Sequence, residues 1–269
     1  MEKYQYIAFI TNENYLKGLF VLSSSLKRNC KVDLSIVVPE TVSDEFISEV
    51  KKYSLNSNVI KMPLINVEEY GWEKSGNRNY WKETFFKLNV ARLTQFDKVV
   101  MLDCDLLILK NIDCLFDMPN FSATNSGHIL FEDWFNLNSG VFVLEPSDKL
   151  FKDLTELIPQ VIDYSVSNDV SVGDQDVFIT YLKDWKDKPE LNFSEKFNCY
   201  YRALYKFANT LPNKIDDVCV VHYFGRTKIW NMTFKAKMIN ALIDLKNRNH
   251  DIKKAVALYN KELVKLKDL

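Results

Sequence analysis

Hydrophobic residues along the first hundred positions follow two alternating spacings. Short apolar runs rich in Val, Ile and aromatic side chains predict strands at residues 4–10, 33–38 and 57–62. Between these runs, apolar residues three or four positions apart predict amphipathic helices at residues 15–28 and 43–53. An alternation of strands and helices is typical of a parallel, doubly wound sheet. We therefore expect an α/β fold with a central, mostly parallel sheet flanked by helices.

The pattern changes after the third predicted strand. The polar segment at residues 63–79 is expected to be a long loop, and helical spacing returns at residues 80–93. The elements expected further on are a central strand at 97–102, strands at 138–146 and 218–222, and helices at 147–166 and 177–182. We find no internal repeat and no linker rich in Gly or Pro, so the chain is expected to form one domain.

Helices are also expected from residue 234 onward. The apolar positions that predict them include Ile239, Leu242 and Leu245, followed by Val256 and Leu263. Their other face is rich in Lys, and we interpret that outer face as solvated surface.

The composition narrows the class of protein without identifying it. Hydrophobic residues make up 47% of the 269 positions and charged residues 26%, as in an ordinary globular domain. The net charge of −1 gives no reason to expect binding to nucleic acid or to an anionic membrane. No stretch approaches roughly 18 uninterrupted apolar residues, so neither secretion nor a membrane span is expected. The five scattered cysteines favour a reducing compartment, the cytoplasm.

Two carboxylates interrupt the most apolar stretch of the chain, residues 98–110. Asp103 and Asp105 follow the predicted central strand, and side chains two positions apart point to the same side of an extended chain. Burying unpaired carboxylates is costly, so a pair in this position needs a cation or hydrogen-bond donors. A divalent cation that bridges to a phosphate is the simplest partner. The alternative is an ordinary loop with two solvated aspartates.

Seven motifs along the chain together resemble those of the retaining glycosyltransferases of family 8. They occur in the order typical of that family, at residues 10–18, 21–27, 103–105, 111–113, 138–142, 173–175 and 221–231. Each motif alone is weak, but the ordered set is very specific.

The resemblance implies a GT-A fold, a Rossmann-like α/β architecture. It also implies transfer of a hexose, glucose before any other, from a UDP-sugar with retention of anomeric configuration. The implied cofactor is Mn²⁺, with Mg²⁺ as the alternative. We expect residues 1–110 to form a nucleotide-binding half, residues 111–232 a half for donor sugar and acceptor, and residues 233–269 the C-terminal helices.

The resemblance also assigns roles to individual residues. The implied metal ligands are Asp103, Asp105 and His222. The implied donor-binding residues are Ile10, Thr11, Asn12 and Tyr15 around the uridine, the basic Arg78 and Lys87, Cys104 between the two aspartates, Asn138 and Ser139 at the sugar hydroxyls, and Gly225 and Lys228 at the diphosphate. The implied catalytic residues are Asp174 and Gln175 beneath the anomeric carbon, together with Lys228.

Several of these residues also have a purely structural interpretation. Tyr15 fits a core position on its helix, because aromatic residues at helical spacing usually pack inward. Arg78 and Lys87 fit solvated surface, and Asn138 with Ser139 fits a simple turn. A lone histidine after a buried strand is more often structural than a ligand.

The acceptor is left open by the resemblance. A glycan, a lipid-linked sugar, a polyol or a protein would serve, and a homodimer is compatible with the family. If the protein glycosylates itself, the candidate acceptors are Tyr200, Tyr201 and Tyr205. Two other functions are weighed: a nucleotide-sugar-binding module without transfer activity, and a metal-dependent phosphohydrolase, for which further acidic or His ligands are not found. A covalent and a front-face mechanism both fit Asp174.

Overall fold

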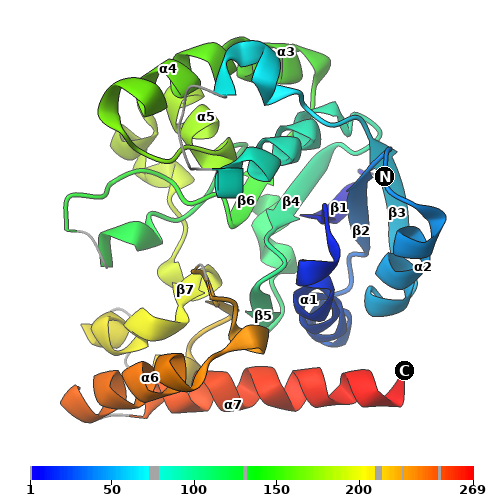
Figure 1. Ribbon diagram of the computed structural model, residues 1–269. Coiled ribbons are helices and arrows are strands. Elements are labelled where there is room, and N and C mark those ends of the chain that lie inside the picture. The colour runs from blue at the N-terminus through cyan, green and yellow to red at the C-terminus, as the bar shows by residue number, and fades with distance from the viewer. Residues whose placement is uncertain (1, 73–78, 130–131, 210–213, 226, 248–249) are drawn as a thin grey trace.

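The structure is a computed structural model that describes residues 2–72, 79–129, 132–209, 214–225, 227–247 and 250–269. Its larger sheet has five strands, β1 (Tyr4–Phe9), β2 (Leu34–Pro39), β3 (Asn58–Met62), β4 (Lys98–Leu102) and β6 (Val141–Leu144). Their order is β3-β2-β1-β4-β6, and all neighbours are parallel except β4 and β6. The predicted central, mostly parallel sheet is therefore confirmed (Figure 1).

Helices cover both faces of this sheet because successive strand residues point to opposite sides. On one face, Tyr6 and Ala8 of β1 pack in a cluster with α1 (Leu16–Asn29) and α2 (Asp44–Tyr53). On the other face, Ile7 of β1 packs in a cluster with further helical segments. These are the 3₁₀ helix Asn79–Arg92, α3 (Asp148–Glu156), α4 (Ile158–Asn168) and α5 (Asp174–Tyr181).

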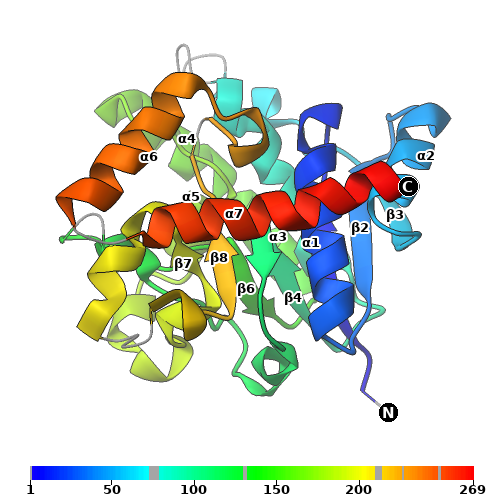
Figure 2. The ribbon, with the colours of Figure 1, turned by 90° about the horizontal axis from the view of Figure 1, so that it is seen from below.

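A second, smaller sheet lies beyond the end of β4. Its strands are β5 (Leu106–Ile108), β7 (Cys199–Tyr200) and β8 (Val220–His222), in the order β5-β8-β7. Two C-terminal helices follow, α6 (Phe234–Lys246) and α7 (Asp251–Val264). Figure 2 shows α7 running across α1 and the small sheet. A third hydrophobic cluster joins these parts and contains the fully buried Tyr259 of α7.

Several predicted elements are wrong in detail. Asp103 and Asp105 lie in a turn between β4 and β5, not in an extended strand, and β7 was not predicted. The single helix predicted at 147–166 is two helices that meet at Leu157. Pro159 explains the break, because proline has no N–H to donate and is tolerated only in the first turn of a helix.

The predicted helix at 80–93 is observed, but with 3₁₀ geometry. Most of its residues from Phe85 to Ala91 are buried against the core. The predicted loop at 63–79 contains a short 3₁₀ helix, Val67–Tyr70, while residues 73–78 lie outside the described part of the chain.

The prediction for the first C-terminal helix is wrong in its orientation. Ile239, Leu242 and Leu245, the apolar positions from which this helix was predicted, are exposed on α6. The later positions Val256 and Leu263 do pack against the hydrophobic cluster beneath α7. The periodicity therefore identified both helices but not which face of α6 is buried.

Candidate active site

A cavity of about 670 Å³ opens at the carboxyl ends of β1 and β4, the edge at which open α/β sheets bind ligands. Its lining comes from segments far apart in the sequence. These are the residues after β1, the 3₁₀ helix Asn79–Arg92, the β4–β5 turn, the residues before β6, the start of α5 and the residues after β8.

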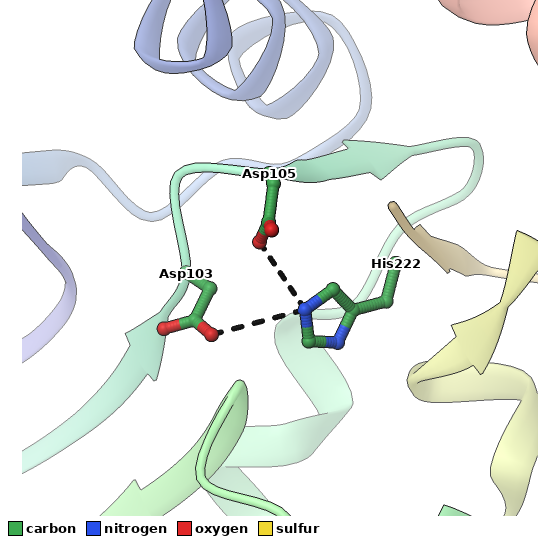
Figure 3. Close-up of side chains that lie close together, drawn as sticks. All are labelled: Asp103, Asp105 and His222. Carbon is green, nitrogen blue, oxygen red and sulfur yellow. Dashed lines mark ion pairs between the residues drawn. The ribbon is translucent and has the colours of Figure 1, made fainter. Parts of the chain in front are cut away.

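Asp103, Asp105 and His222 meet at this cavity (Figure 3). The Nε2 atom of His222 lies 3.2 Å from Oδ1 of Asp105 and 3.8 Å from Oδ2 of Asp103. One ligand atom from each of the three residues can be chosen so that all lie within 4.8 Å of one another. Adjacent ligands about 2.1 Å from one ion are roughly 3 Å apart, so this spacing fits a shared divalent cation.

Backbone contacts hold the two aspartates in place. The N–H of Asp103 donates to the carbonyl of Gly140 at 2.9 Å, and the carbonyl of Asp105 accepts from the N–H of Tyr223 at 2.9 Å. A Cβ atom at position 140 would lie 2.6 Å from the ring of His222. The absence of a side chain at Gly140 therefore lets the imidazole of His222 approach the backbone directly before β6.

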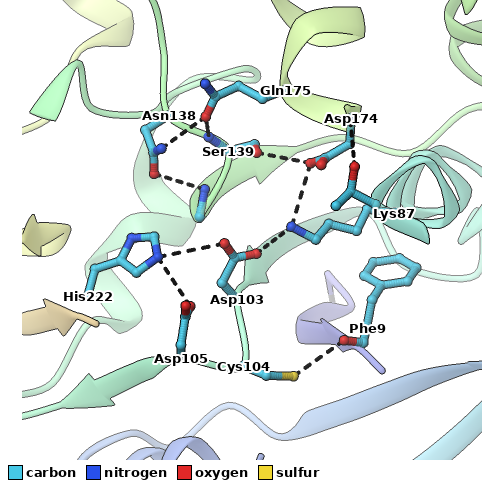
Figure 4. Close-up of polar contacts among 12 residues, drawn as sticks. Phe9, Lys87, Asp103, Cys104, Asp105, Asn138, Ser139, Asp174, Gln175 and His222 are labelled. Carbon is cyan, nitrogen blue, oxygen red and sulfur yellow. Dashed lines mark hydrogen bonds and ion pairs between the residues drawn. The ribbon is translucent and has the colours of Figure 1, made fainter. Parts of the chain in front are cut away.

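A relay of amides fixes which nitrogen of His222 faces the carboxylates. The backbone N–H of Ser139 donates to Oε1 of Gln175, which also accepts from Nδ2 of Asn138 (Figure 4). The Oδ1 atom of Asn138 then accepts from the N–H of Gly140 and from Nδ2 of Asn198.

The relay ends at the histidine ring. Because Nδ2 of Asn198 donates to Asn138, the Oδ1 atom of Asn198 is the one that faces Nδ1 of His222, at 2.8 Å. Nδ1 must then carry a proton, and Nε2 is the nitrogen that faces Asp103 and Asp105. A neutral imidazole oriented by a hydrogen bond at its other nitrogen is the usual state of a metal-binding histidine.

Two lysines balance the carboxylates of the cavity. Lys87 lies 2.6 Å from Asp103 and 3.7 Å from Asp174, and Lys228 lies 2.7 Å from Asp105. Burial alone would lower the pKa of Lys87, but the two aspartates outweigh it and raise that pKa above its usual value. Burial alone would raise the pKa of Asp105, but Lys228 and His222 outweigh it and hold that pKa well below its usual range.

Asp174 behaves differently from Asp105. It is 3% exposed at the start of α5, its carboxylate accepts from the hydroxyl of Ser139 at 2.9 Å, and its N–H donates to the hydroxyl of Thr84 at 3.1 Å. Burial is the largest influence and raises the pKa of Asp174 despite the nearby Lys87.

The structure brings most of the predicted site residues to the cavity. The predicted residues that line it are Ile10, Thr11, Tyr15, Lys87, Asp103, Cys104, Asp105, Asn138, Ser139, Asp174, Gln175, His222, Gly225 and Lys228. Asn12 is not among the lining residues: its amide donates to Glu83, and its Oδ1 accepts from the N–H of Asn14. Arg78 lies outside the described residues.

Tyr15 contacts both the hydrophobic core and the cavity, the two environments considered for it. Its ring packs partly against the core and edge-on against Trp230, and it also lines the cavity, where the ammonium of Lys228 lies 5.3 Å from the ring centroid. Gly225 adopts φ +131°, a conformation that glycine reaches readily and other residues do not.

Sequence reasoning missed several residues of the cavity. Asn198 carries no motif signal, and only the fold shows that this buried amide contacts His222. The other lining residues missed include Trp81, Glu83, Thr84, Trp134, Tyr164, Asp176 and Phe224. Of the candidate acceptor tyrosines, Tyr200 lines the cavity, Tyr201 packs against Tyr223 outside it, and the side chain of Tyr205 is outside the described part.

The fold and the cavity define the class of protein, a glycosyltransferase with a GT-A fold. Residues 6–233 match the family model of glycosyl transferase family 8. The chain therefore belongs to glycosyltransferase family 8, as the motifs predicted.

Known proteins support this assignment. The chain is 30% identical to glycogenin-1 of Caenorhabditis elegans over 243 residues, which cover 84% of this chain and 50% of that protein. It is 29% identical to glycogenin-1 of Mus musculus over 238 residues, which cover 87% of this chain and 68% of that protein. The chain thus spans about half the length of the nematode relative.

Solved structures agree on the fold. The galactosyltransferase LgtC, in complex with donor and acceptor sugar analogs, superimposes with a TM-score of 0.62 at 17% identity. The match covers 89% of this chain and 95% of LgtC. Among the residues that the structure describes, no helix is both long and apolar enough to cross a membrane.

Proposed function

We propose that the protein is a metal-dependent, retaining hexosyltransferase that moves glucose from UDP-glucose to an acceptor hydroxyl in the cytoplasm. One observation carries this proposal. The cluster of Asp103, Asp105 and His222 lies in one cavity together with Tyr15 and Asp174. The cavity can therefore hold a nucleotide, a cation and a sugar side by side.

The residues of the cluster fit a divalent cation. They offer two carboxylates and an imidazole whose Nε2 faces both of them, while Nδ1 is held by Asn198. Mixed nitrogen and oxygen ligands favour Mn²⁺ over Mg²⁺, which prefers oxygen alone. When bound, the ion supplies positive charge that stabilises the departing diphosphate.

The remaining charges of the cavity support the same reaction. We assign Lys228 and the backbone at Gly225 to the diphosphate, where an ammonium group stabilises developing negative charge. Asp174 places a buried carboxylate where the sugar ring becomes positively charged, and Gln175 is held beside it by Asn138 and Ser139.

A neutral hexose fits the cavity better than an acidic sugar. Among the described lining residues, the Lys and Arg side chains are Lys87 and Lys228, and both are paired with carboxylates. A uronic acid would bring a further negative charge beside three carboxylates. This favours UDP-glucose over UDP-glucuronate as the donor.

Release of UDP tests the proposal. The purified protein is incubated with Mn²⁺ and, in turn, UDP-glucose, UDP-galactose and UDP-glucuronate, with simple sugars and polyols as acceptors. We expect UDP release to be fastest with UDP-glucose, to stop with EDTA and to be absent in Asp103→Asn. The anomeric proton of the product, measured by NMR, should have the configuration of the donor.

The outcomes separate the alternatives. If the folded protein releases UDP from none of the three donors, it is not a transferase for them. If it then still binds UDP in the presence of Mn²⁺, it is a nucleotide-sugar-binding module. The intact mass after incubation with donor alone tests self-glycosylation. An increase of one hexose that is lost in Tyr200→Phe identifies the tyrosine in the cavity as an acceptor, whereas an unchanged mass excludes it.

A further inference from the structure

Helix α6 has its polar and apolar faces reversed relative to an ordinary surface helix. Its buried positions are Ala236, Asn240 and Asp244, which recur every four residues. Helices of globular proteins normally turn an apolar face inward and a charged face to solvent. In α6 two of the three buried side chains are polar, and although Ile243 packs partly against the core, such packing does not explain the other large apolar residues of this helix.

The inward polar face is fixed by specific bonds. The side-chain oxygen of Asn240 accepts from Nε of Arg202 at 2.9 Å. The carboxylate of Asp244 accepts from the N–H groups of Ile252 at 3.1 Å and Lys253 at 2.9 Å, in the first turn of α7. These bonds satisfy free N–H groups of α7, so a rotation of α6 that buried its apolar face would break them.

Four large apolar side chains form the outward face. They are Phe234, Met238, Leu242 and Leu245, with exposed fractions of 78%, 52%, 60% and 74%. At about 100° per residue, the four fall within roughly 80° of the helix circumference. They thus form one continuous stripe, hereafter the α6 stripe, along a helix at the edge of the molecule (Figures 1 and 2).

Lysines border the α6 stripe. By the same helical geometry, Lys235 and Lys246 lie along one side of it and Lys237 along the other. The acids of the two C-terminal helices, Asp244, Asp251 and Glu262, are all buried. The last 37 residues contain nine Lys and Arg against four Asp and Glu, whereas the whole chain has 35 against 36. The net charge of −1 therefore conceals a positive C-terminal region.

We propose that the α6 stripe docks on an anionic membrane surface. A helix that presents Phe, Leu and Met side chains between rows of lysine binds at the level of lipid headgroups, with its apolar residues in the acyl boundary and its ammonium groups at the phosphates. Such docking requires no spanning segment. It is an alternative to our interpretation of the Lys-rich face as solvated surface.

The charges favour a membrane over a second copy of the chain as the occupant. Pairing two α6 stripes would bring the bordering lysines of both copies together. No exposed carboxylate of α6 is present to neutralise them, because its one acid, Asp244, is buried. An anionic lipid surface supplies that negative charge instead.

Docking would also place the cavity near the membrane. The chain runs directly from cavity residues Gly225 and Lys228 to the start of α6 at Phe234. The proposal itself does not depend on the donor or on transfer activity, because none of the residues of α6 lines the cavity.

Co-sedimentation with vesicles tests the docking. The full chain is mixed with vesicles of phosphatidylcholine and phosphatidylglycerol in about a two-to-one ratio, and with vesicles of phosphatidylcholine alone. We expect the protein to bind the anionic vesicles, with affinity that falls as salt is added. Leu242→Ser with Leu245→Ser should weaken binding at least about tenfold, since both leucines lose their insertion. Lys235→Gln, Lys237→Gln and Lys246→Gln together should weaken it by about fivefold per lysine.

Matched variants elsewhere serve as controls. Lys149→Gln with Lys152→Gln changes two exposed lysines of α3, at the opposite end of the molecule from α6 (Figure 1), and Leu64→Ser changes another exposed leucine. Neither should alter vesicle binding, and all variants should keep the wild-type melting temperature within a few degrees. Absence of binding to anionic vesicles overturns the proposal. So does a wild-type dimer that the leucine variants dissociate, because the α6 stripe is then an interface between copies.

Discussion

Two buried acids, Asp105 in the cavity and Glu262 on α7, look alike until their partners are compared. Each is 4% exposed, each pairs with a lysine, and in each case bonding partners outweigh burial and lower the pKa of the carboxyl. The partners of Asp105, Lys228 and His222, line a cavity. Those of Glu262 are Lys265, directly after the end of α7, and Ser24 and Arg28 of α1, so its bonds fasten α7 to α1.

The balance of charge separates the two sites. Around Glu262 one carboxylate contacts two cations, Arg28 and Lys265. In the cavity, the carboxylates of Asp103, Asp105 and Asp174 face two ammonium groups from the described part of the chain, those of Lys87 and Lys228. The first site is complete as a structural contact, whereas the second is prepared for an added cation.

The largest expected effect tests the cavity side of this comparison. Asp105→Asn should lower the rate of sugar transfer at least about a thousandfold, because it removes a negative ligand from the cation site. The melting temperature should stay near that of the wild type, since the amide keeps an oxygen that accepts from Lys228 and the backbone bond to Tyr223 is unchanged. Steady-state rates and thermal unfolding of the same preparation measure both. Retained activity would show that Asp105 is not required at the site.

The second prediction tests the structural side. Glu262→Gln should lower the free energy of unfolding by about 2 kcal/mol, because Arg28 and Lys265 lose their partner and are only partly exposed to water. Urea unfolding measures this change. The rate of transfer at low temperature should equal that of the wild type. A stable but inactive variant would contradict the separation of the two sites.

The third prediction concerns the amide of Asn198, which contacts both Asn138 and His222. Asn198→Ala removes the acceptor that holds the Nδ1 proton of His222, so Nε2 loses its fixed orientation. We expect the affinity for Mn²⁺ to fall about tenfold, with a smaller change at saturating metal. Titration of the transfer rate with Mn²⁺ measures it, and Asn260→Ala, at an exposed position of α7, is the control. Equal metal affinity in both variants would deny Asn198 a positioning role.

Local patterns were sufficient to predict the strands of the larger sheet and the pair Asp103 and Asp105, whereas the other predicted cavity residues came from the resemblance to the family. The strands at Tyr4–Phe9 and Leu34–Pro39 are marked by continuous apolar runs, and parallel strands bring their carboxyl ends to one edge. Asp103 and Asp105 were therefore found from the chain alone, and their position in a turn between two strands did not separate them from His222.

Features that depend on distant contacts could not be predicted in this way. The strand Cys199–Tyr200 has only two residues, too few to show a period, and exists because β8 pairs with it. The orientation of α6 depends on Arg202 and on the first turn of α7, so a helical repeat of apolar residues could not indicate which face is buried. The amide of Asn198 is likewise placed by the fold.

The last prediction, with the smallest expected effect, concerns Asp176. This acid also lines the cavity, but its carboxylate accepts from a neutral backbone N–H and not from a lysine. Its carboxylate accepts from the N–H of Gly173 at 2.7 Å, and burial raises its pKa to about 6 from the ordinary 3.8. A carboxyl whose pKa is raised on folding destabilises the folded state when ionised. This penalty is absent below about pH 4, grows between about pH 4 and 6, and is complete above.

Asp176→Asn should remove this penalty while keeping an oxygen that accepts from Gly173. We expect the variant to be more stable than the wild type by about 1 kcal/mol near pH 7.5, less than the full shift implies because Asp176 is partly exposed. The gain should shrink as pH falls and vanish below about pH 4, as urea unfolding at several pH values would show. A gain that is the same at every pH would mean that the charge of Asp176 is not its cause, and Asp184→Asn, at an exposed position, should give no gain at all.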